Sequence, residues 1–410
     1  MESGLRGWEV CVSTDKTAKN PGLPNAADVV IVGGGVMGAA TAFYLAQAGV
    51  RDVLLLERDA LGSGGTGRSM AILRMHYSNE VTVRMAHESR LVIADFERVV
   101  GAPSGFVKTG YVLLVAPEQA TALRKNVALG RSLGVDARSL SPGEGAGVLP
   151  AGFALDGVGA VAFEPDSGYA DSSAVTNGFA SAARRSGARI ALGVGVRSVL
   201  VRNGKVTGVD TTSGPVNARV VVLVAGAGTP DLLRGVGADL PVSFVRHQVV
   251  KLHRPLDRLP THPTIADVPG CLSFRPDSGD LTLVGIREDP VDSADYVRTV
   301  DTEVALEAMD AVAHRLGPMA DAGWDGGWAG LFDVTPDWHP VIDHVPGVEG
   351  LVCGVGFSGH GFKLSPTVGR ALAELVVHGE TRMIDMRALR FTRFEEGELL
   401  RSAYGGTVFA

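Results

Sequence analysis

The chain has 410 residues, of which 45% are hydrophobic and 20% charged, as is typical of a folded protein with two domains. Its formal net charge of −7 argues against binding to nucleic acid or to an anionic membrane surface. Three scattered cysteines are too few for a disulfide framework or a metal cluster, so we expect no metal site and a reducing, cytoplasmic environment.

Residues 1–27 form the first predicted segment. They are polar, contain prolines and charges, and lack the apolar stretch of a secretory signal, so we expect a flexible N-terminal tail. Elsewhere no uncharged apolar stretch approaches the roughly 20 residues that span a bilayer. We therefore expect no contact with a membrane.

A strand, a glycine-rich turn and a helix follow the tail. Residues 29–32 are a continuous β-branched run that predicts a buried parallel strand, and residues 39–48 predict a helix. Gly33, Gly35 and Gly38 lie between them and fit the pattern GxGxxG. This strand–turn–helix context is the one that dinucleotide binding requires.

Each glycine has an expected role in such a turn. Gly33 permits the tight turn, Gly35 lets a pyrophosphate approach the backbone, and Gly38 lets the helix pack on the strand. The next strand, 52–57, ends at Glu57, where a carboxylate accepts hydrogen bonds from a ribose 2′-OH. The alternative is that Glu57 is only a polar residue that closes a strand.

A segment further along the chain favours FAD over NAD. Residues 218–233 predict a second buried strand that leads into a helix, and short strands joined by an Asn203-Gly204 turn precede it. A simple NAD domain continues with alternating strands and helices. In FAD-binding oxidoreductases, by analogy, a few short strands are instead inserted before the chain returns to the nucleotide-binding sheet.

Three stretches resemble the D-amino-acid oxidase superfamily, especially its glycine oxidase and sarcosine oxidase branch. They are the glycine turn with Glu57, GSGGTGRSMAILRMHYSNE at 62–80, and GVGFSGHGFKLSPTVGRALAEL at 354–375. DVTPDWHPVID at 333–343 also matches, and LRFTRFEEGELL near the end resembles the beta subunit of heterotetrameric sarcosine oxidase.

The resemblance implies an α/β fold (α+β overall), with a Rossmann-like FAD-binding domain and an inserted mixed-sheet substrate domain. The expected FAD-binding domain comprises residues 28–100, 160–238 and 336–395. Residues 101–159 and 239–335 are expected to form the substrate-binding domain, and 396–410 a C-terminal tail.

The resemblance also implies which residues bind the cofactor. In the family, side chains at the positions of Ser69 and Met70 lie close to the flavin ring, and the backbone at Val196 contacts adenine. The full expected set is Gly33, Gly35, Val36, Met37, Gly38, Glu57, Arg58, Arg68, Ser69, Met70, Val196, Ala225, Gly226, Gly359, His360, Gly361, Phe362 and Lys363.

Arg74 and Lys363 are the expected catalytic residues, because they match the two residues that grip the substrate carboxylate in sarcosine oxidases. A guanidinium can hold a carboxylate through two parallel bonds, and a lysine adds a point charge. Taken alone, Arg74 would more often be a surface or ion-paired arginine, and Lys363 an exposed lysine at the start of a helix. The role of the histidines, of which His76, His247 and His339 are examples, stays open.

At three positions the sequence departs from the family, and these departures bear on how the flavin is attached and on which electron acceptor is used. Gly330 stands where monomeric sarcosine oxidase carries a cysteine linked to flavin, so we expect non-covalent FAD. Residues 162–175 lack the histidine that carries FMN in the beta subunit, so we expect no second covalent flavin. Thr282 takes the place of a lysine over the flavin that promotes reaction with oxygen, and its neutrality leaves oxidase and dehydrogenase both open.

The function these features indicate is oxidation of the C–N bond of an amino acid or N-alkyl amino acid to an imine, with electrons passed to oxygen. The expected partners are an amine substrate with a carboxylate, oxygen or another acceptor, and a second copy or further subunits. One alternative is a dehydrogenase or beta-like subunit that passes electrons to a partner. The other is an NAD(P)H-dependent flavin reductase, which needs a second GxGxxG unit that VAGAGTP supplies only in part.

Overall fold

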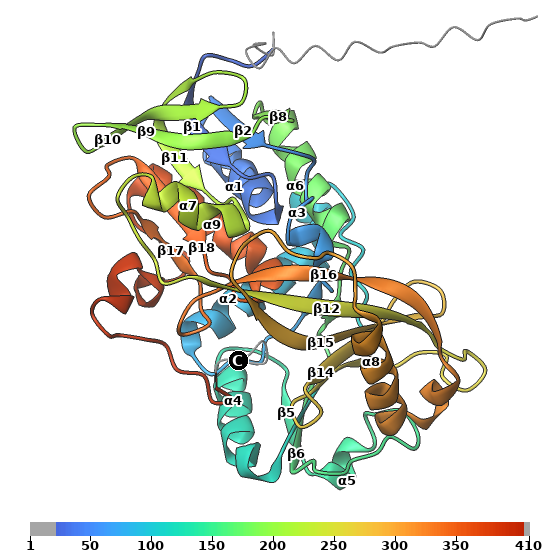
Figure 1. Cartoon of the computed structure of the whole chain (residues 1–410). Helices are drawn as coiled ribbons and strands as arrows, with labels where there is room; N and C mark the ends of the chain where they lie inside the picture. Colours follow the sequence, from blue (N-terminus) through green and yellow to red (C-terminus); the bar gives the residue numbers. More distant parts are fainter. Residues whose placement is uncertain (1–21, 406–410) are drawn as a thin grey trace, which may run out of the picture.

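The computed structural model describes residues 22–405, and most of the predicted N-terminal tail lies outside that range. The described residues form two eight-stranded sheets in two adjoining parts, with helices packed around both (Figure 1), and a small two-stranded sheet of β3 and β7. None of the helices in residues 22–405 is long and apolar enough to cross a membrane.

The first sheet is mostly parallel and contains the glycine turn. β1 pairs in parallel with β2 and β11, and β11 pairs in parallel with β18. Across the sheet the order is β17 (Val341–His344), β18 (Leu351–Val355), β11 (Val216–Leu223), β1 (Ala26–Val32), β2 (Val53–Glu57) and β8 (Arg189–Leu192), with β9 (Val196–Arg202) and β10 (Lys205–Thr211) attached through β10 to β11.

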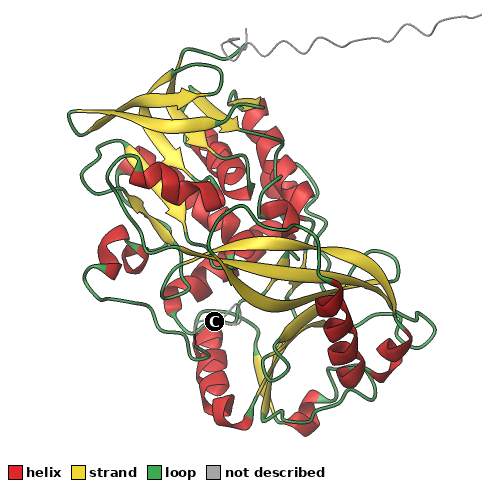
Figure 2. Ribbon diagram, in the orientation of Figure 1, coloured by secondary structure: helices red, strands yellow, loops and turns green. Residues whose placement is uncertain are grey.

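This sheet is buried on both faces, which explains its continuous apolar strands. Val29 and Ile31 of β1 point into a core shared with the helices, whereas Val30 and Val32 point into a second core shared with β9 and β10. Figure 2 shows helices on one face and the β9–β10 hairpin on the other. The helices of that face are α1 (Val36–Gln47), α6 (Ser172–Arg185) and α9 (Gly361–His378).

The second sheet is mixed. All its neighbouring strands are antiparallel except β13 and β4, which are parallel. Its order is β16 (Gly323–Val334), β12 (Ser243–His253), β15 (Leu281–Val291), β14 (Leu272–Pro276), β13 (Thr264–Asp267), β4 (Tyr111–Val115), β6 (Ala160–Glu164) and β5 (Arg138–Leu140).

The two faces of the second sheet have different neighbours. One face packs against α8 (Thr302–Arg315), and the other carries Tyr111 and Leu283, which contact cores that contain residues of the first part. Helix α8 buries Val304, Ala308 and Val312 against the sheet, whereas Leu306 is 55% exposed. The fold class inferred from the sequence is therefore confirmed.

One predicted domain boundary needs correction. β6 begins at residue 160, where we expected the second FAD segment, yet it pairs with β4 and β5 of the second sheet. Its sequence AVAFE is as apolar as a strand of either sheet, so composition alone does not assign β6 to one sheet or the other.

The remaining elements are β3 (Ile72–Leu73), β7 (Gly168–Tyr169), α2 (Glu80–Ala94), α3 (Phe96–Val100), α4 (Ala120–Ser132), α5 (Pro142–Gly145) and α7 (Thr229–Arg234).

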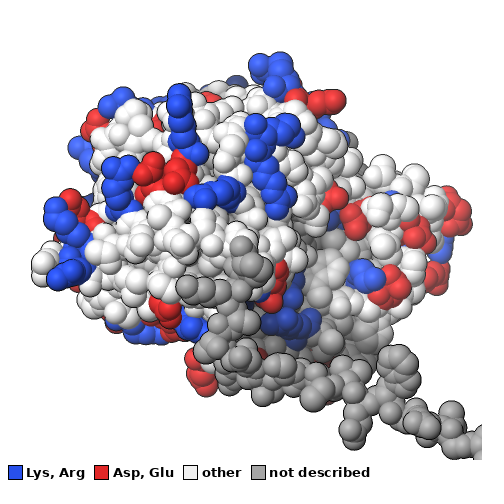
Figure 3. Space-filling view, turned by 90° about the horizontal axis from the view of Figure 1, so that it is seen from above, with Lys and Arg blue, Asp and Glu red and all other residues white. Residues whose placement is uncertain are grey.

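Charges of both signs are mixed on the face seen from above in Figure 3. Around the first sheet, Arg219 pairs with Asp28 at 2.5 Å, and Lys205 pairs with Glu349 at 2.7 Å. Such alternation does not form the basic stripe that is typical of a nucleic-acid site.

Candidate functional site

The glycine turn packs so closely that side chains do not fit. A Cβ on Gly38 would lie 1.9 Å from the carbonyl oxygen of Gly33, and a Cβ on Gly33 would lie 2.5 Å from that of Val224. Gly33 also has a φ of +111°, in the region that favours glycine. The first N–H groups of α1 lack intrahelical acceptors, so the turn presents a positive helix end suited to phosphate.

Glu57 lies beside this turn, at the end of β2. Its carboxylate accepts hydrogen bonds from the N–H of Gly34 at 2.7 Å and of Asp59 at 2.8 Å. A carboxylate has about four acceptor positions, so capacity for ribose hydroxyls remains. The N–H of Val194 donates to the Glu57 carbonyl at 2.9 Å, which brings the start of β9 at Val196 close to the same strand end.

The loop at residues 62–70 lies over the start of α1. The hydroxyl of Thr66 accepts from the N–H of Val36 at 3.1 Å, and the N–H of Gly62 donates to the Gly34 carbonyl at 2.9 Å. Arg68 folds back and donates to two carbonyls of its own loop, and its carbonyl accepts from the Trp328 indole at 2.8 Å. The predicted residues 68–70 are thus joined to both parts of the molecule.

The second glycine-rich turn, 356–361, approaches the same helix end. A Cβ on Gly361 would lie 3.3 Å from Cε of Met37, at the first turn of α1. Gly359 has a φ of +80°, which permits the reversal into α9. Asp333 accepts from the N–H of Gly356 at 2.7 Å and holds this turn to β16, and burial raises the pKa of Asp333 to about 6.

These segments fit a dinucleotide with a flat ring system. Both turns are lined by glycines where a Cβ would collide, and they meet at a helix N-terminus, as the phosphates of FAD need. His360 Nε2 is buried without a partner among the described residues, so an acceptor or donor of a bound group could satisfy it.

Arg74 lies on the segment that follows β3 and is 5% exposed. Its guanidinium lies 4.3 Å from the centroid of the Tyr77 ring and 3.3 Å from His360 Nδ1, and it donates to the His76 carbonyl. Burial opposes its charge, but nearby tyrosines and Glu164 more than offset this and raise the pKa of Arg74. Arg74 therefore remains a buried cation.

Lys363, in the first turn of α9, is 7% exposed. Burial, and then the charge of Arg74, hold its pKa well below the usual range. No ion pair joins it to a carboxylate in residues 22–405. The two predicted catalytic residues thus lie within electrostatic reach of each other, and a bound carboxylate would relieve their repulsion.

The other predicted cofactor residues lie at different depths around the turns. Ala225 follows β11, and its Cα would be 2.9 Å from a Cβ on Gly33, whereas Gly226 is exposed. Phe362 packs in the core beside α1. The Arg58 side chain is 73% exposed and pairs with Asp59 at 3.4 Å, so its side chain faces solvent.

Four histidines of the resembling segments are buried and have lowered pKa values. Burial lowers the pKa of His76 to about 3 and that of His247 to about 4. Burial also lowers the pKa of His339 and, with Lys363 and Arg74, that of His360. All four are neutral near pH 7, and in residues 22–405 no group of His, Cys, Asp and Glu side chains could hold a metal.

The expectation for Thr282 is wrong. Thr282 pairs across the sheet with Leu252 and lies 3.0 Å from His262 Nε2, on the face that packs under α8. Leu283, one residue later, shares the opposite face with Met70. Since side chains alternate along a strand, a one-residue difference moves a side chain to the other face. The neutrality of Thr282 therefore carries no information about oxygen.

Several side chains around Arg74 were not predicted. Tyr77 lies in the same segment, and Tyr111 and Glu164 come from β4 and β6, which places three buried groups within electrostatic reach of Arg74. Glu164 accepts from the N–H of Met75 at 2.9 Å. Its position at the end of the apolar strand AVAFE was the signal available in the sequence.

Comparisons with known proteins agree with this geometry. The family model described as "FAD dependent oxidoreductase" matches residues 28–375. The chain is 26% identical over 386 residues to mitochondrial sarcosine dehydrogenase of Mus musculus, covering 91% of this chain but only 42% of that protein. It is 27% identical over 409 residues to sarcosine oxidase subunit beta of Rhodobacter capsulatus, covering 96% and 93% of the two chains.

A solved structure has the same fold over nearly the whole chain. The L-proline dehydrogenase from P. horikoshii superposes with a TM-score of 0.85 at 27% identity, covering 92% of this chain and 100% of that one. One assignment follows from the glycine turn at 33–38, from Glu57 beside it, and from the family match over 28–375. The chain belongs to the family of FAD-dependent oxidoreductases, whose cofactor is FAD.

Proposed function

We propose that the protein oxidises the C–N bond of an amino acid or N-alkyl amino acid to an imine. The observation that carries this proposal is the pair of buried basic side chains, Arg74 and Lys363, beside the glycine turns. The carboxylate common to amino acids is a group that a guanidinium can bind through two parallel bonds, and its negative charge would favour the charged form of Lys363. The names of the relatives, sarcosine dehydrogenase and sarcosine oxidase subunit beta, support the same substrate class.

The protein's own contribution is orientation and electrostatics. Arg74 and Lys363 hold the carboxylate, and its charge raises the pKa of Lys363 back toward the usual range. The neutral His76 and His360 add no competing charge. Bound FAD would supply the two-electron oxidation of the carbon next to nitrogen, and the imine product would be hydrolysed by water.

We propose that FAD is held without a covalent bond. Gly330, at the position of the family's flavin-linked cysteine, lies next to Arg68, with 3.5 Å between a built Cβ and Arg68 Cβ. Gly330 has no thiol, so it cannot form a thioether with the flavin. The proposal predicts that acid precipitation releases all the yellow chromophore into the supernatant.

The electron acceptor is proposed to be oxygen, which takes two electrons and two protons to give hydrogen peroxide. The alternative is a dehydrogenase or a beta-like subunit that passes electrons to a partner, and it is favoured by the names of two relatives, sarcosine dehydrogenase and L-proline dehydrogenase. A flavin reductase is less well supported, because α7 after the partial glycine motif has only six residues.

We further propose a cytoplasmic protein that acts as a homodimer or as part of a hetero-oligomer. In the described part of the chain, Cys271 and Cys353 are both free thiols, as a reducing compartment allows.

An anaerobic absorbance titration tests the function. Purified yellow protein is mixed with sarcosine, dimethylglycine, proline and D-amino acids, and then exposed to air. Loss of the oxidised flavin band with one of them supports amine oxidation, and rapid return of colour in air supports an oxidase. Slow return supports the dehydrogenase or partner-dependent alternative, whereas bleaching by NADH alone would make the proposal wrong.

A further inference from the structure

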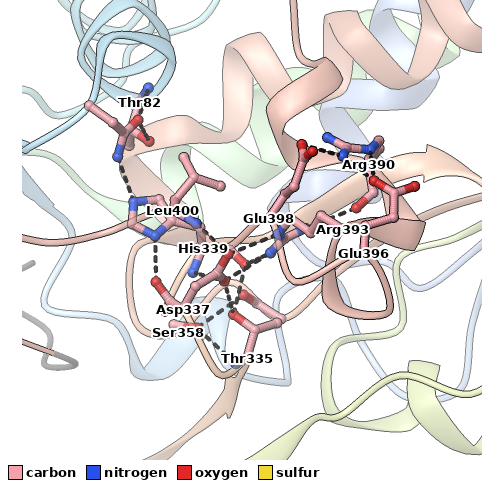
Figure 4. Close-up of polar contacts among 12 residues, drawn as sticks. Thr82, Thr335, Asp337, His339, Ser358, Arg390, Arg393, Glu396, Glu398 and Leu400 are labelled. Atoms are coloured by element: carbon pink, nitrogen blue, oxygen red, sulfur yellow. Dashed lines mark hydrogen bonds and ion pairs between the residues drawn. The ribbon is translucent and has the colours of Figure 1, made fainter.

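The end of the described chain, which includes part of the predicted C-terminal tail, packs against the rest of the molecule. We call residues 395–404 the C-terminal strap. The strap follows Arg393, whose side chain is fully buried and pairs with both carboxylate oxygens of Asp337 at 2.8 and 2.9 Å. The N–H of Leu400 donates to the same carboxylate at 3.2 Å (Figure 4). Asp337 therefore fixes the start and the middle of the strap to the β16–β17 connection.

The strap ends against the segment that carries Arg74. The N–H of Ala403 donates to the Ser78 hydroxyl at 2.9 Å, and the Tyr404 hydroxyl lies 2.7 Å from His76 Nε2. The rings of Tyr404 and His76 stack, with centroids 5.7 Å apart and an interplanar angle of 24°. Tyr404 is only 7% exposed. The chain therefore buries an aromatic side chain against His76, which lies two residues after Arg74 in the sequence.

The hydrogen-bond roles at this contact can be assigned. His76 is neutral, and the amide group of Asn126, on α4, lies 3.4 Å from the same ring nitrogen and donates to the Ser78 hydroxyl. A ring nitrogen that faces an N–H donor is an acceptor, so the Tyr404 O–H donates to His76 Nε2. Arg74 and Tyr404 interact electrostatically, which places the phenol within the field of the guanidinium.

We propose that Tyr404 is a substrate-positioning residue that limits the size of the substrate held by Arg74. This inference rests on the proposed function, in which Arg74 binds the substrate carboxylate. The Tyr404 ring stacks on His76, whose carbonyl accepts a hydrogen bond from Arg74, so it fills buried space near Arg74. A carboxylate at Arg74 can therefore carry only a small group on that side. The substrate class is accordingly an amino acid with a small side chain and a small N-substituent.

Two variants and a matched control test the proposal in the FAD-loaded protein. Tyr404→Phe removes only the hydroxyl, and Tyr404→Ala also removes the ring. The control is Tyr44→Phe, which removes a phenol hydroxyl from α1, in the core beside Phe43 and Phe179. Acetate and benzoate serve as small and large carboxylate probes, and their binding is followed by the change in the visible flavin spectrum.

We expect Tyr404→Phe to weaken acetate binding by roughly fivefold, because one hydrogen bond that orients His76 beside Arg74 is lost. Tyr404→Ala should bind benzoate about tenfold more tightly than the wild type while binding acetate more weakly. The Tyr44→Phe control should leave both affinities unchanged.

Two results would overturn the inference, and they are distinguishable. If both variants retain FAD and bind acetate and benzoate as the wild type does, Tyr404 has no role at the site. If neither carboxylate changes the flavin spectrum of the wild-type protein, Arg74 does not bind carboxylates near the flavin, and the proposed function fails together with this inference.

Discussion

The proposed chemistry depends on two buried basic residues, Arg74 and Lys363. Lys363 has no carboxylate partner in residues 22–405, and its pKa is depressed first by burial and then by Arg74. Replacing Lys363 by Met keeps the bulk of the side chain and removes the charge. We expect KM for the amino acid substrate to rise roughly 10- to 100-fold, as for the loss of a charged hydrogen bond, with a smaller effect on kcat.

A matched control separates this effect from a general loss of charge. Lys205→Met removes a lysine of the β9–β10 hairpin. Its side chain is 64% exposed and pairs with Glu349. Steady-state kinetics should show no change in KM for that variant. A fall in kcat with unchanged KM for Lys363→Met would contradict the assignment of Lys363 to carboxylate binding.

The buried carboxyl group of Asp333 predicts how the stability of the folded protein changes with pH. Burial raises its pKa from 3.8 to about 6, so the folded protein binds this proton more tightly than the unfolded chain does. The associated stability is fully present below about pH 4 and is lost as pH rises through about 6, up to roughly 3 kcal/mol for a shift of about 2 units. The Asp333→Asn variant keeps an acceptor for Gly356 without the titration.

Urea denaturation of the wild type and of Asp333→Asn at several pH values measures the difference. The wild type should lose free energy of unfolding relative to the variant between pH 4 and 7. Asp257→Asn, at a side chain that is 79% exposed, is the control and should follow the wild type throughout. A constant difference between Asp333→Asn and the wild type would contradict the raised pKa.

Among the elements, α1 and its turn make the strictest demand on sequence. At Gly38 even one methyl group would lie 1.9 Å from the Gly33 carbonyl, so the start of α1 would have to move away from β1. We expect Gly38→Ala to lower the free energy of unfolding by about 1–3 kcal/mol and to lose much of its FAD. Gly317→Ala, where nothing lies within 4 Å of the new Cβ, should retain both FAD and stability.

Elements that a short stretch of sequence specifies could be predicted. The strands with which they pair could not, because pairing depends on residues far away in the sequence. The Asn203-Gly204 pair predicts a hairpin, and the two residues have φ values of +53° and +72° in the turn between β9 and β10. β6 was assigned to the wrong part because its apolar sequence suits either sheet. Thr282 was assigned to the wrong face because its face depends on register with β12, which is set far away in the sequence.

At the scale of the whole molecule, the candidate site is assembled from distant segments. Arg74 follows β3, Tyr111 comes from the second sheet, Lys363 from α9, and Tyr404 from the C-terminal strap. The resemblance could predict the first and third, because each lies in a long stretch of family sequence. Tyr111 and Tyr404 lie outside those stretches, and only tertiary packing brings them to Arg74.

A buried ion pair between Arg393 and Asp337 fixes the chain just before the strap begins. Both side chains are fully buried, and Arg393 also donates to the His339 carbonyl at 2.7 Å. Removing one member leaves the other charge buried and unpaired. We therefore expect Arg393→Met to lower the free energy of unfolding by about 3–5 kcal/mol, measured by urea denaturation.

The double variant Arg393→Met/Asp337→Asn distinguishes a charge effect from a packing effect. Because it removes both charges, it should recover part of the stability that the single variant loses. Arg387→Met is the control, since Arg387 and Asp385 form an exposed pair, and it should change stability by no more than about 0.5 kcal/mol. If Arg393→Met is as stable as Arg387→Met, the buried pair does not anchor the chain before the strap. The end of the strap would then be held by the contacts of Tyr404 with His76 and of Ala403 with Ser78.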